Sequence, residues 1–226
     1  MTASGYFVTG TDTGVGKTLV ACALLHAFAR MGKRVVGMKP VAAGAVRDAE
    51  GWLNDDVAQL CAAGNVKFDR ALVNPYCFEA AIAPHIAARL AGVTIDLASV
   101  VVAYTRLAAT ADVVIVEGAG GFCVPLNRTV DSADLAQRLC LPVILVVGVR
   151  LGCLNHAILT AAAVRARGLK LAGWIANRID AAMPVADENI AALGERLDSP
   201  LLGTVEFSPA PDAHRLSSQL NLAALR

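Results

Sequence analysis

One glycine-rich segment constrains this chain more than any other feature: Gly10-Thr11-Asp12-Thr13-Gly14-Val15-Gly16-Lys17-Thr18. A short apolar run, Tyr6-Phe7-Val8, precedes it, and residues 18–31 follow with helical spacing of apolar side chains as far as Gly32. In such a strand–loop–helix unit, glycines let backbone N–H groups converge on phosphate oxygens, and the helix presents the positive end of its dipole. The segment therefore predicts a phosphate-binding loop.

This loop differs by one residue from the Walker pattern G-x-x-x-x-G-K-[ST]. The pattern requires glycine where the chain has Thr11, and Gly10 lies one residue too early. Lys17 would still neutralise the β- and γ-phosphates, and the Thr18 hydroxyl would ligate Mg²⁺. A plain glycine-rich turn with a threonine cap is the alternative, but the strand before and the helix after favour a variant P-loop.

Strand-length apolar runs alternate with helical patterns along the rest of the chain. We predict strands at 34–38, 113–116, 143–147, 171–176 and 201–205, and helices at 55–63, 95–111, 134–139, 154–167 and 185–197. Such alternation implies right-handed βαβ crossovers. The predicted fold is α/β, a single domain over residues 1–226 with a mostly parallel sheet and helices on both faces.

Composition and charge narrow the possible partners. Lysine plus arginine number 20 against 19 acidic residues, without a basic block, so a nucleic-acid partner is not expected. The longest apolar stretches, such as 139–149, are shorter than the roughly 20 residues of a membrane-spanning helix. Residues 1–5 are uncharged and do not resemble a signal peptide. We expect a cytoplasmic protein that acts on small molecules.

Cysteine usage fits that expectation. The six cysteines, at positions 22, 61, 77, 123, 140 and 153, include no Cys-x-x-Cys pair. We predict that they are reduced and serve as small hydrophobic residues of the core.

Acidic residues after two predicted strands are candidate Mg²⁺ ligands. In a parallel sheet, ligands bind beyond the carboxyl ends of the strands. Glu117 ends the strand 113–116 and precedes Gly118-Ala119-Gly120-Gly121. Asp55 and Asp56 begin the helix after the second strand, where capping of that helix is an equally good interpretation. Glu117 is therefore the stronger candidate.

Two further residues end predicted strands. Lys39 follows the second strand and could stabilise charge in phosphoryl transfer if strands one and two are both near the sheet centre. An ordinary surface lysine is the alternative. Asn177 could pair with the adenine edge, but its residue type alone favours a strand-ending turn.

Motifs along nearly the whole chain resemble the dethiobiotin synthetase family. They include the loop above, Lys39-Pro40-Val41-Ala42, Val73-Asn74-Pro75-Tyr76 and Pro84-His85. Val116-Glu117-Gly118-Ala119-Gly120-Gly121, Pro142–Gly148, Leu151-Gly152-Cys153, Asn155-His156 and Gly173-Trp174-Ile175-Ala176-Asn177 follow in order. The variant loop is itself characteristic of this family.

The resemblance implies that Mg·ATP, CO₂ and 7,8-diaminononanoate give dethiobiotin, ADP and phosphate, through an N-carbamate and a carbamic–phosphoric anhydride. It assigns Lys39, Lys17 and Thr11 to catalysis, and Thr18, Asp56 and Glu117 to the metal. Nucleotide binding is assigned to Thr13, Gly14, Val15, Gly16, Lys17, Thr18, Leu19, Asp56, Glu117, Gly118, Ala119, Gly120, Asn177, Arg178, Glu206, Phe207 and Ser208.

The same resemblance places substrate contacts at Thr11, Lys39, Ala43, Leu151, Gly152, Cys153, Leu154 and Asn155. In the family, the segment 151–155 comes from the neighbouring subunit, so a homodimer with substrate at the interface is implied. Free N–H groups at the start of the helix suit the substrate carboxylate; a helix start without a ligand is the alternative.

Three positions depart from the family pattern. Ala43 replaces a frequent serine, and Gly14 stands where an acidic residue can occur. Gly203-Thr204-Val205-Glu206 lacks the proline of the family's Gly-x-x-Pro segment, which puts the base contacts of Glu206, Phe207 and Ser208 in doubt.

Two other classes share parts of this pattern. ATP switches of the ParA/MinD type carry a signature lysine where this chain has Asp12, and commonly end in a membrane- or DNA-binding element, for which residues 220–226 are a poor candidate. Iron–sulfur ATPases of the nitrogenase iron-protein type would need Cys123 or Cys140 at a cluster, and a buried structural thiol is the preferred interpretation of Cys123.

Overall fold

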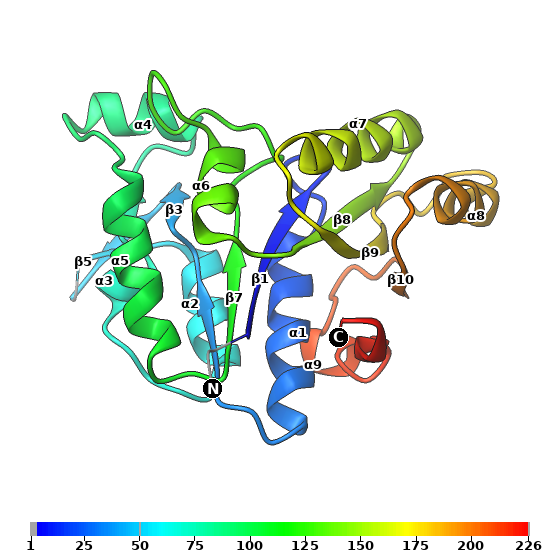
Figure 1. The fold of residues 1–226 in the computed structure, drawn as a ribbon, viewed down its shortest axis with the longest axis horizontal. Coiled ribbons are helices and arrows are strands. Elements are labelled where there is room, and N and C mark those ends of the chain that lie inside the picture. The colour runs from blue at the N-terminus through cyan, green and yellow to red at the C-terminus, as the bar shows by residue number, and fades with distance from the viewer. Residues whose placement is uncertain (1–3, 50, 226) are drawn as a thin grey trace.

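The computed structural model describes residues 4–49 and 51–225 and centres on a parallel sheet (Figure 1). Its six strands lie in the order β10-β9-β8-β1-β7-β2. In chain order they are β1 (Ser4–Gly10), β2 (Val35–Met38), β7 (Val113–Glu117), β8 (Val143–Val149), β9 (Leu171–Arg178) and β10 (Leu201–Val205). Each neighbouring pair is parallel, which confirms the predicted α/β class.

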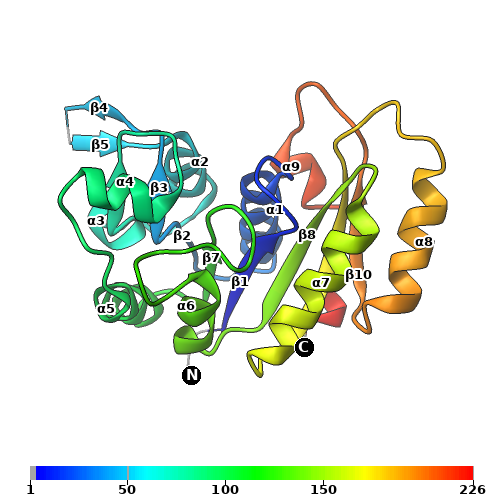
Figure 2. The same ribbon diagram turned by 90° about the horizontal axis from the view of Figure 1, so that it is seen from above.

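Helices cover both faces of this sheet (Figure 2). On one face pack α1 (Lys17–Arg30) and α9 (Ala213–Leu216). On the other pack α5 (Leu97–Ala108), α6 (Ser132–Leu139), α7 (Cys153–Ala166) and α8 (Ala186–Arg196). Successive residues of β1 serve the two cores alternately, since side chains of a strand point to opposite faces: Phe7 packs under α5 to α8, and Tyr6 and Val8 pack under α1.

Short elements lie beside and beyond β2, and one of them, α2, packs Leu60 and Ala63 into the same core as α1. They are the parallel pair β3 (Val41–Ala43) and β6 (Tyr76–Phe78), the antiparallel hairpin β4 (Val46–Asp48) and β5 (Gly51–Leu53), and the helices α2 (Asp55–Ala63), α3 (Arg70–Val73) and α4 (Pro84–Leu90). Except for α2, sequence reasoning did not predict them, because segments of three to seven residues show no measurable period.

Several helices and strands begin or end at residues other than those predicted, in two cases because of a capping side chain. The helix predicted at 95–111 is Leu97–Ala108, because the Asp96 carboxylate accepts hydrogen bonds from the Ala98 and Ser99 N–H groups and fixes the start. The helix predicted at 134–139 begins at Ser132, where Asp131 and Asp134 form a capping box. The strand predicted at 171–176 extends to Arg178.

The sheet order corrects one assumption about Lys39. Strand β1 is central, but β2 is the edge strand, and β7 lies between them. Met38 is in register with Val116, so Lys39 and Glu117 leave adjacent strands at the same edge of the sheet. Lys39 therefore approaches the P-loop across β7, and not by direct strand pairing.

The end of the chain packs on the α1 face. Leu220, Leu222 and Leu225 contact that core, and the Tyr6 hydroxyl donates a hydrogen bond to the Leu225 carbonyl at 2.6 Å. A 3₁₀ turn, η1 (Leu222–Ala224), closes the segment. Two pieces of segments discussed above lie outside the described residues. They are residues 1–3, considered for a signal peptide, and Arg226, considered as part of a binding tail. Across the described part of the chain, no helix combines the length and apolarity that crossing a membrane requires.

The cysteines only partly follow expectation. All six are free, and Cys22 and Cys153 are buried, but Cys123 and Cys140 are exposed. The prediction of buried thiols was wrong for these two because both follow the end of an element. Cys140 caps α6 in the left-handed region, with φ of 52°, and Cys123 lies on the loop after β7.

Candidate active site

A hollow of about 840 Å³ opens at the carboxyl edge of β1, β7 and β2. Segments far apart in the sequence meet there: the glycine-rich loop, the ends of β2 and β7, and the start of α2. The residues that line it are Asp12, Thr13, Gly14, Gly16, Lys17, Thr18, Lys39, Val41, Ala43, Asp56, Ala81, Ile82, Ala83, Pro84, Glu117, Ala119, Gly120, Gly121 and Val124. The segment 81–84 was missed, because apolar loop residues carry no chemical signal.

The glycine-rich loop needs its glycines for two different reasons. Gly14 and Gly16 have φ of 74° and 89°, in the left-handed region that disfavours side chains. A Cβ at Gly16 would also lie 2.2 Å from Nδ2 of Asn177, whereas one at Gly14 would meet nothing within 4 Å. Gly16 is therefore fixed by packing as well as by backbone conformation, and it leads directly into α1.

Lys17 is almost fully buried beneath this loop. Its Nζ donates a hydrogen bond to the Asp12 carbonyl at 2.9 Å, and the residue is only 7% exposed. Burial and the neighbouring Lys39 lower the pKa of Lys17 to about 8, although Glu117 and Asp56 oppose this shift. An anion entering the hollow would raise this pKa again.

Lys39 is the centre of a buried ion-pair network. Its Nζ lies 2.5 Å from Oε1 of Glu117 and 2.8 Å from Oδ2 of Asp56, and the residue is 4% exposed. Burial disfavours its ammonium form, but the two carboxylates outweigh burial and raise the pKa of Lys39. The surface-lysine interpretation was therefore wrong.

The side chain of Asn54 shows whether Asp56 caps α2 or has a free carboxylate. Asn54 is the N-cap of α2, and its side chain accepts a hydrogen bond from the Asp56 N–H. Its Nδ2 also donates to the Ala43 carbonyl at 3.0 Å. Asp55 and Asp56 occupy the first turn, where their charge complements the helix dipole, and neither is the cap. The Asp56 carboxylate is free to pair with Lys39.

The oxygen atoms near Glu117 form a donor set suited to a hard cation. The Thr18 hydroxyl donates to Oε1 of Glu117 at 2.9 Å. Oε2 of Glu117 is buried and has no hydrogen-bond partner among the described residues, and burial raises the pKa of this carboxyl although Lys39 opposes it. A buried carboxylate oxygen without a partner, with Asp56 and a hydroxyl nearby, fits the oxygen ligands that Mg²⁺ prefers.

Asn74 is a second buried amide that the sequence reasoning did not single out. Its Nδ2 donates to the Lys39 carbonyl at 2.6 Å and to the Tyr76 carbonyl at 3.0 Å. The Lys39 N–H in turn donates to the Val73 carbonyl. Asn74 thus fixes the backbone that carries Lys39, and its place inside the motif Val73-Asn74-Pro75-Tyr76 was the available signal.

The residues expected at the base end of a nucleotide lie outside this lining. Asn177 belongs to β9 and not to a turn, and its Nδ2 donates to the Val15 carbonyl at 2.9 Å. Arg178 follows it, with Nε 3.4 Å from Oε1 of Glu206. Seven other expected residues also lie outside the lining: Thr11, Val15, Leu19, Gly118, Glu206, Phe207 and Ser208.

The segment 151–155 does not line the hollow of its own chain in the described structure. It forms the start of α7, where Leu151 is 94% exposed and Cys153 is buried. Arg150, just before it, pairs with Asp12 of the P-loop, with 2.5 Å between Nη2 and Oδ2. The residue just before the segment is therefore joined to Asp12, which lines the hollow.

Known proteins match this chain over nearly its whole length. A family model described as an AAA domain matches residues 4–215. ATP-dependent dethiobiotin synthetase BioD of Nitrosospira multiformis is 58% identical over 221 residues, covering 98% of this chain and 96% of the relative. The chain belongs to the dethiobiotin synthetase family. The same protein of Aromatoleum aromaticum is 58% identical over 219 residues, covering 96% of each. As a member of the dethiobiotin synthetase family, the chain is an enzyme of the ligase class.

Solved structures outside the dethiobiotin synthetase family share the fold. The septum-site protein MinD of Pyrococcus horikoshii, determined with Mg-ADP, superimposes with a TM-score of 0.56 at 20% identity, covering 92% of this chain and 83% of that one. MinD of Aquifex aeolicus gives 0.55 at 17% identity, covering 92% and 84%. At such identity the likeness extends to the P-loop fold alone, and the switch class weighed above gains no support from it.

Proposed function

We propose that this protein closes the ureido ring of dethiobiotin from 7,8-diaminononanoate, CO₂ and ATP. One amine takes up CO₂ and loses a proton, giving a carbamate. A carbamate oxygen attacks the γ-phosphorus and ADP leaves. The second amine then attacks the carbamate carbon of the mixed anhydride, loses a proton and expels phosphate. Membership of the dethiobiotin synthetase family supports this reaction.

The two buried lysines of one hollow are the observation that carries the proposal. A carbamate and a γ-phosphate are both anions, so their approach requires fixed positive charge between them. Lys17 and Lys39 both line the hollow and are 7% and 4% exposed. Lys39 is held by both Glu117 and Asp56, so its ammonium is fixed before the substrate arrives. Thr11, at the end of β1, is the third proposed catalytic residue.

A divalent cation fits beside these lysines. Thr18, Asp56 and Glu117 would hold Mg²⁺, which would neutralise part of the phosphate charge when bound. The chain's own contribution is to supply the oxygen donors and to keep Lys39 between the two acids. The backbone N–H groups of residues 13–18 would cradle the phosphates at the start of α1.

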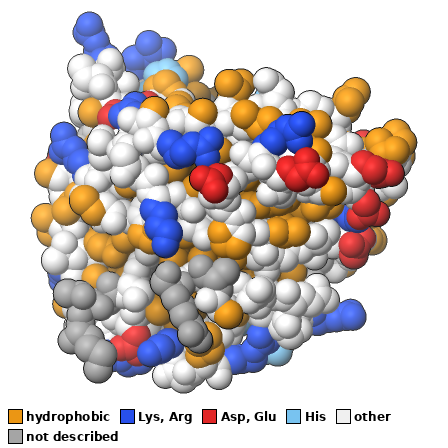
Figure 3. Space-filling view, turned by 45° about the vertical axis from the view of Figure 1, so that its right-hand side comes forward, with side chains coloured by type: hydrophobic (Ala, Val, Ile, Leu, Met, Phe, Trp, Pro, Cys, Tyr) orange, Lys and Arg blue, Asp and Glu red, His pale blue; other side chains and the backbone are white. Residues whose placement is uncertain are grey.

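We further propose that the active enzyme is a homodimer with the substrate chain at the interface. The segment 151–155 would enter the hollow of the partner and offer its N–H groups to the substrate carboxylate. Exposed apolar side chains just before and on α7 support a partner there: Leu151 is 94% exposed, and Ile158 and Leu159 on the helix are 36% and 60% exposed. Figure 3 shows hydrophobic side chains gathered among charged ones on one face of the molecule.

A turnover assay tests the reaction. Protein incubated with Mg·ATP, bicarbonate and 7,8-diaminononanoate should form dethiobiotin, ADP and phosphate in equal amounts, with CTP tested in parallel. Lys17→Ala and Lys39→Ala should each lower kcat/KM by about 100-fold or more, as removal of electrostatic stabilisation does in other enzymes. Absence of dethiobiotin from the unmodified protein, at neutral and mildly alkaline pH, would refute the proposal.

A further inference from the structure

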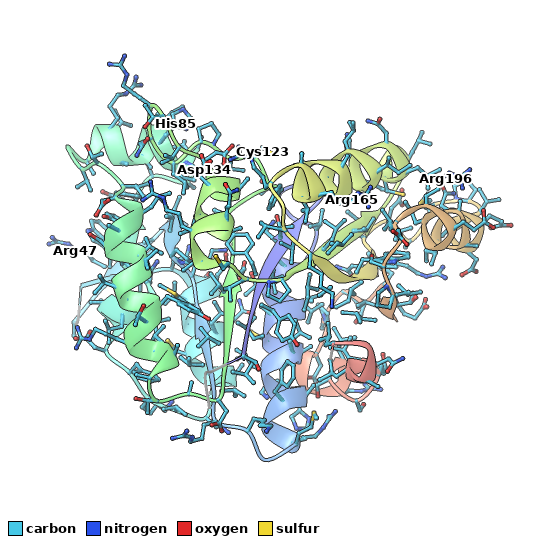
Figure 4. The ribbon with its side chains drawn as sticks, in the orientation of Figure 1. Arg47, His85, Cys123, Asp134, Arg165 and Arg196 are labelled. Atoms are coloured by element: carbon cyan, nitrogen blue, oxygen red, sulfur yellow. The ribbon has the colours of Figure 1, made fainter. Side chains whose placement is uncertain are left out.

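A second hollow, also of about 840 Å³, lies outside the proposed active site. It opens between α4, the connection from α4 to α5, and the loop from β7 to α6. Figure 4 labels His85 where α4 meets this loop. The first hollow is lined by residues 81–84 at the start of α4, and the second by His85 and Arg89 farther along the same helix. The two hollows therefore lie on either side of one helix start and share no lining residue.

The titratable side chains that line this second hollow are all basic. Arg89, Arg128 and His85 line it, and no described acidic residue does. Neither guanidinium has an ion pair or side-chain hydrogen bond within the described part of the chain. Nδ1 of His85 is buried and likewise lacks a described hydrogen-bond partner. The nearby Asp96 carboxylate is committed to capping α5. Both guanidiniums are exposed and are available to pair with an anion through charge-assisted hydrogen bonds.

The remaining lining is apolar at its base. Ala88, Ile95 and Leu126 are buried and form a floor, whereas Thr94 and Thr129 are exposed. A ligand that satisfies both parts needs an anionic group for the arginines and a hydrocarbon part for the floor. A bare phosphate would leave the floor uncovered.

The walls of this hollow are tied together before any ligand binds. Asn127 Nδ2 donates to the Ile95 carbonyl at 2.9 Å, which joins the loop after β7 to the connection before α5. Oδ1 of Asn127 accepts from the N–H groups of Thr129 and Val130 and fixes the turn that carries Arg128. Arg89 lies in the last turn of α4, which closes through the Gly92 N–H to the Arg89 carbonyl. Such preorganisation lowers the entropic cost of binding.

We propose that this hollow is a second ligand site, which binds a small carboxylate with an aliphatic body through Arg89 and Arg128, beside the His85 side chain. This site does not depend on the reaction proposed above, since none of its residues lines the active-site hollow.

Calorimetry with octanoate as the probe tests this site, using full-length protein saturated with ADP so that the nucleotide hollow is occupied. Arg89→Gln and Arg128→Gln should each weaken octanoate binding by about tenfold, because each removes a charge-assisted hydrogen bond. Arg106→Gln, an exposed arginine at the other end of α5, is the matched control and should leave binding unchanged. Inorganic phosphate should bind at least tenfold more weakly than octanoate.

Three results would each overturn the proposal. They are no binding of octanoate to the unmodified protein, binding of phosphate as tight as that of octanoate, and octanoate binding by both arginine variants equal to that of the Arg106→Gln control. The turnover assay, run on the same preparations, shows separately whether the proposed reaction fails, so loss of this binding site and loss of the reaction can be distinguished. Thermal unfolding of each variant verifies that the substituted proteins are folded.

Discussion

Nζ of Lys39 lies 2.5 Å from Oε1 of Glu117, and both side chains are almost completely removed from water. Each charge is therefore tolerated only because the other is present. Asp56 adds a second carboxylate at 2.8 Å, and Asn74 and Asn54 fix the backbone of Lys39 and the helix of Asp56. This network should dominate both the stability of the free protein and its chemistry.

Lys39→Met should unfold more easily because it leaves the Glu117 carboxylate buried without its cation. Removing one partner of a buried pair costs about 3–5 kcal/mol, measured as the free energy of unfolding in urea. The double variant Lys39→Met with Glu117→Gln removes both charges and should recover part of this loss. Equal stability of Lys39→Met and the unmodified protein would contradict the buried pairing.

Gly16→Ala should abolish nucleotide binding, whereas Gly14→Ala should only weaken it. Both glycines have positive φ, so each variant carries backbone strain of about 1 kcal/mol. At Gly16, however, the new Cβ would lie 2.2 Å from Nδ2 of Asn177 and displace the loop from β9. Calorimetric titration with Mg·ATP measures the difference, and equal affinities of the two variants would show that Asn177 does not constrain the loop.

Asp112 should give a pH-dependent contribution to stability. Its hydrogen bonds with the Arg34 side chain and N–H lower the pKa of Asp112 from 3.8 to about 2. A depressed pKa in the folded protein means that the contribution is present above about pH 4 and is lost as the pH falls toward 2. The difference in Tm between the unmodified protein and Asp112→Asn should therefore disappear near pH 2.

Two controls isolate this effect. Glu79→Gln changes an exposed carboxylate that has no ion pair among the described residues, and should show no such convergence. High salt should reduce the Asp112 effect because both partners are partly exposed. A Tm difference that stays constant from neutral pH to pH 2 would rule out the Arg34 pairing as its source.

Two inactive variants should complement each other if the segment 151–155 serves the partner's site. Lys39→Ala removes the lysine of one chain, and Gly152→Val perturbs the start of α7, where φ is 94°. In a randomly mixed dimer population, half the molecules are hybrids with one intact site each, so about one quarter of full activity should return. Sedimentation must show dimers in every sample; no activity in the mixture would argue against a shared site.

The sequence was sufficient for the α/β fold class and for the position of the glycine-rich loop between β1 and α1. The P-loop is local, so its residues could be found from spacing alone, and β7 could be placed from its run of β-branched residues. The burial of Lys39 was harder to predict, because it depends on β7 lying between β1 and the edge strand β2. Strand order of this kind is a long-range property that no local pattern records.

The amide residues show the same limit. Asn54 and Asn74 act through hydrogen bonds to backbone carbonyls that lie far away along the chain, at Ala43 and Lys39. Nothing in their residue type distinguishes them from asparagines in ordinary turns. Exposure of Cys123 and Cys140 was also missed, because a thiol is equally compatible with a core and with a loop.

The path of oxygen from CO₂ tests the central claim most directly. If a carbamate oxygen attacks the γ-phosphorus and phosphate is later expelled, that oxygen leaves with the phosphate. Turnover with ¹⁸O-labelled CO₂ in ordinary water, followed for times shorter than CO₂ hydration, should yield phosphate that carries one labelled oxygen per dethiobiotin formed. Unlabelled phosphate alongside dethiobiotin formation would contradict the account.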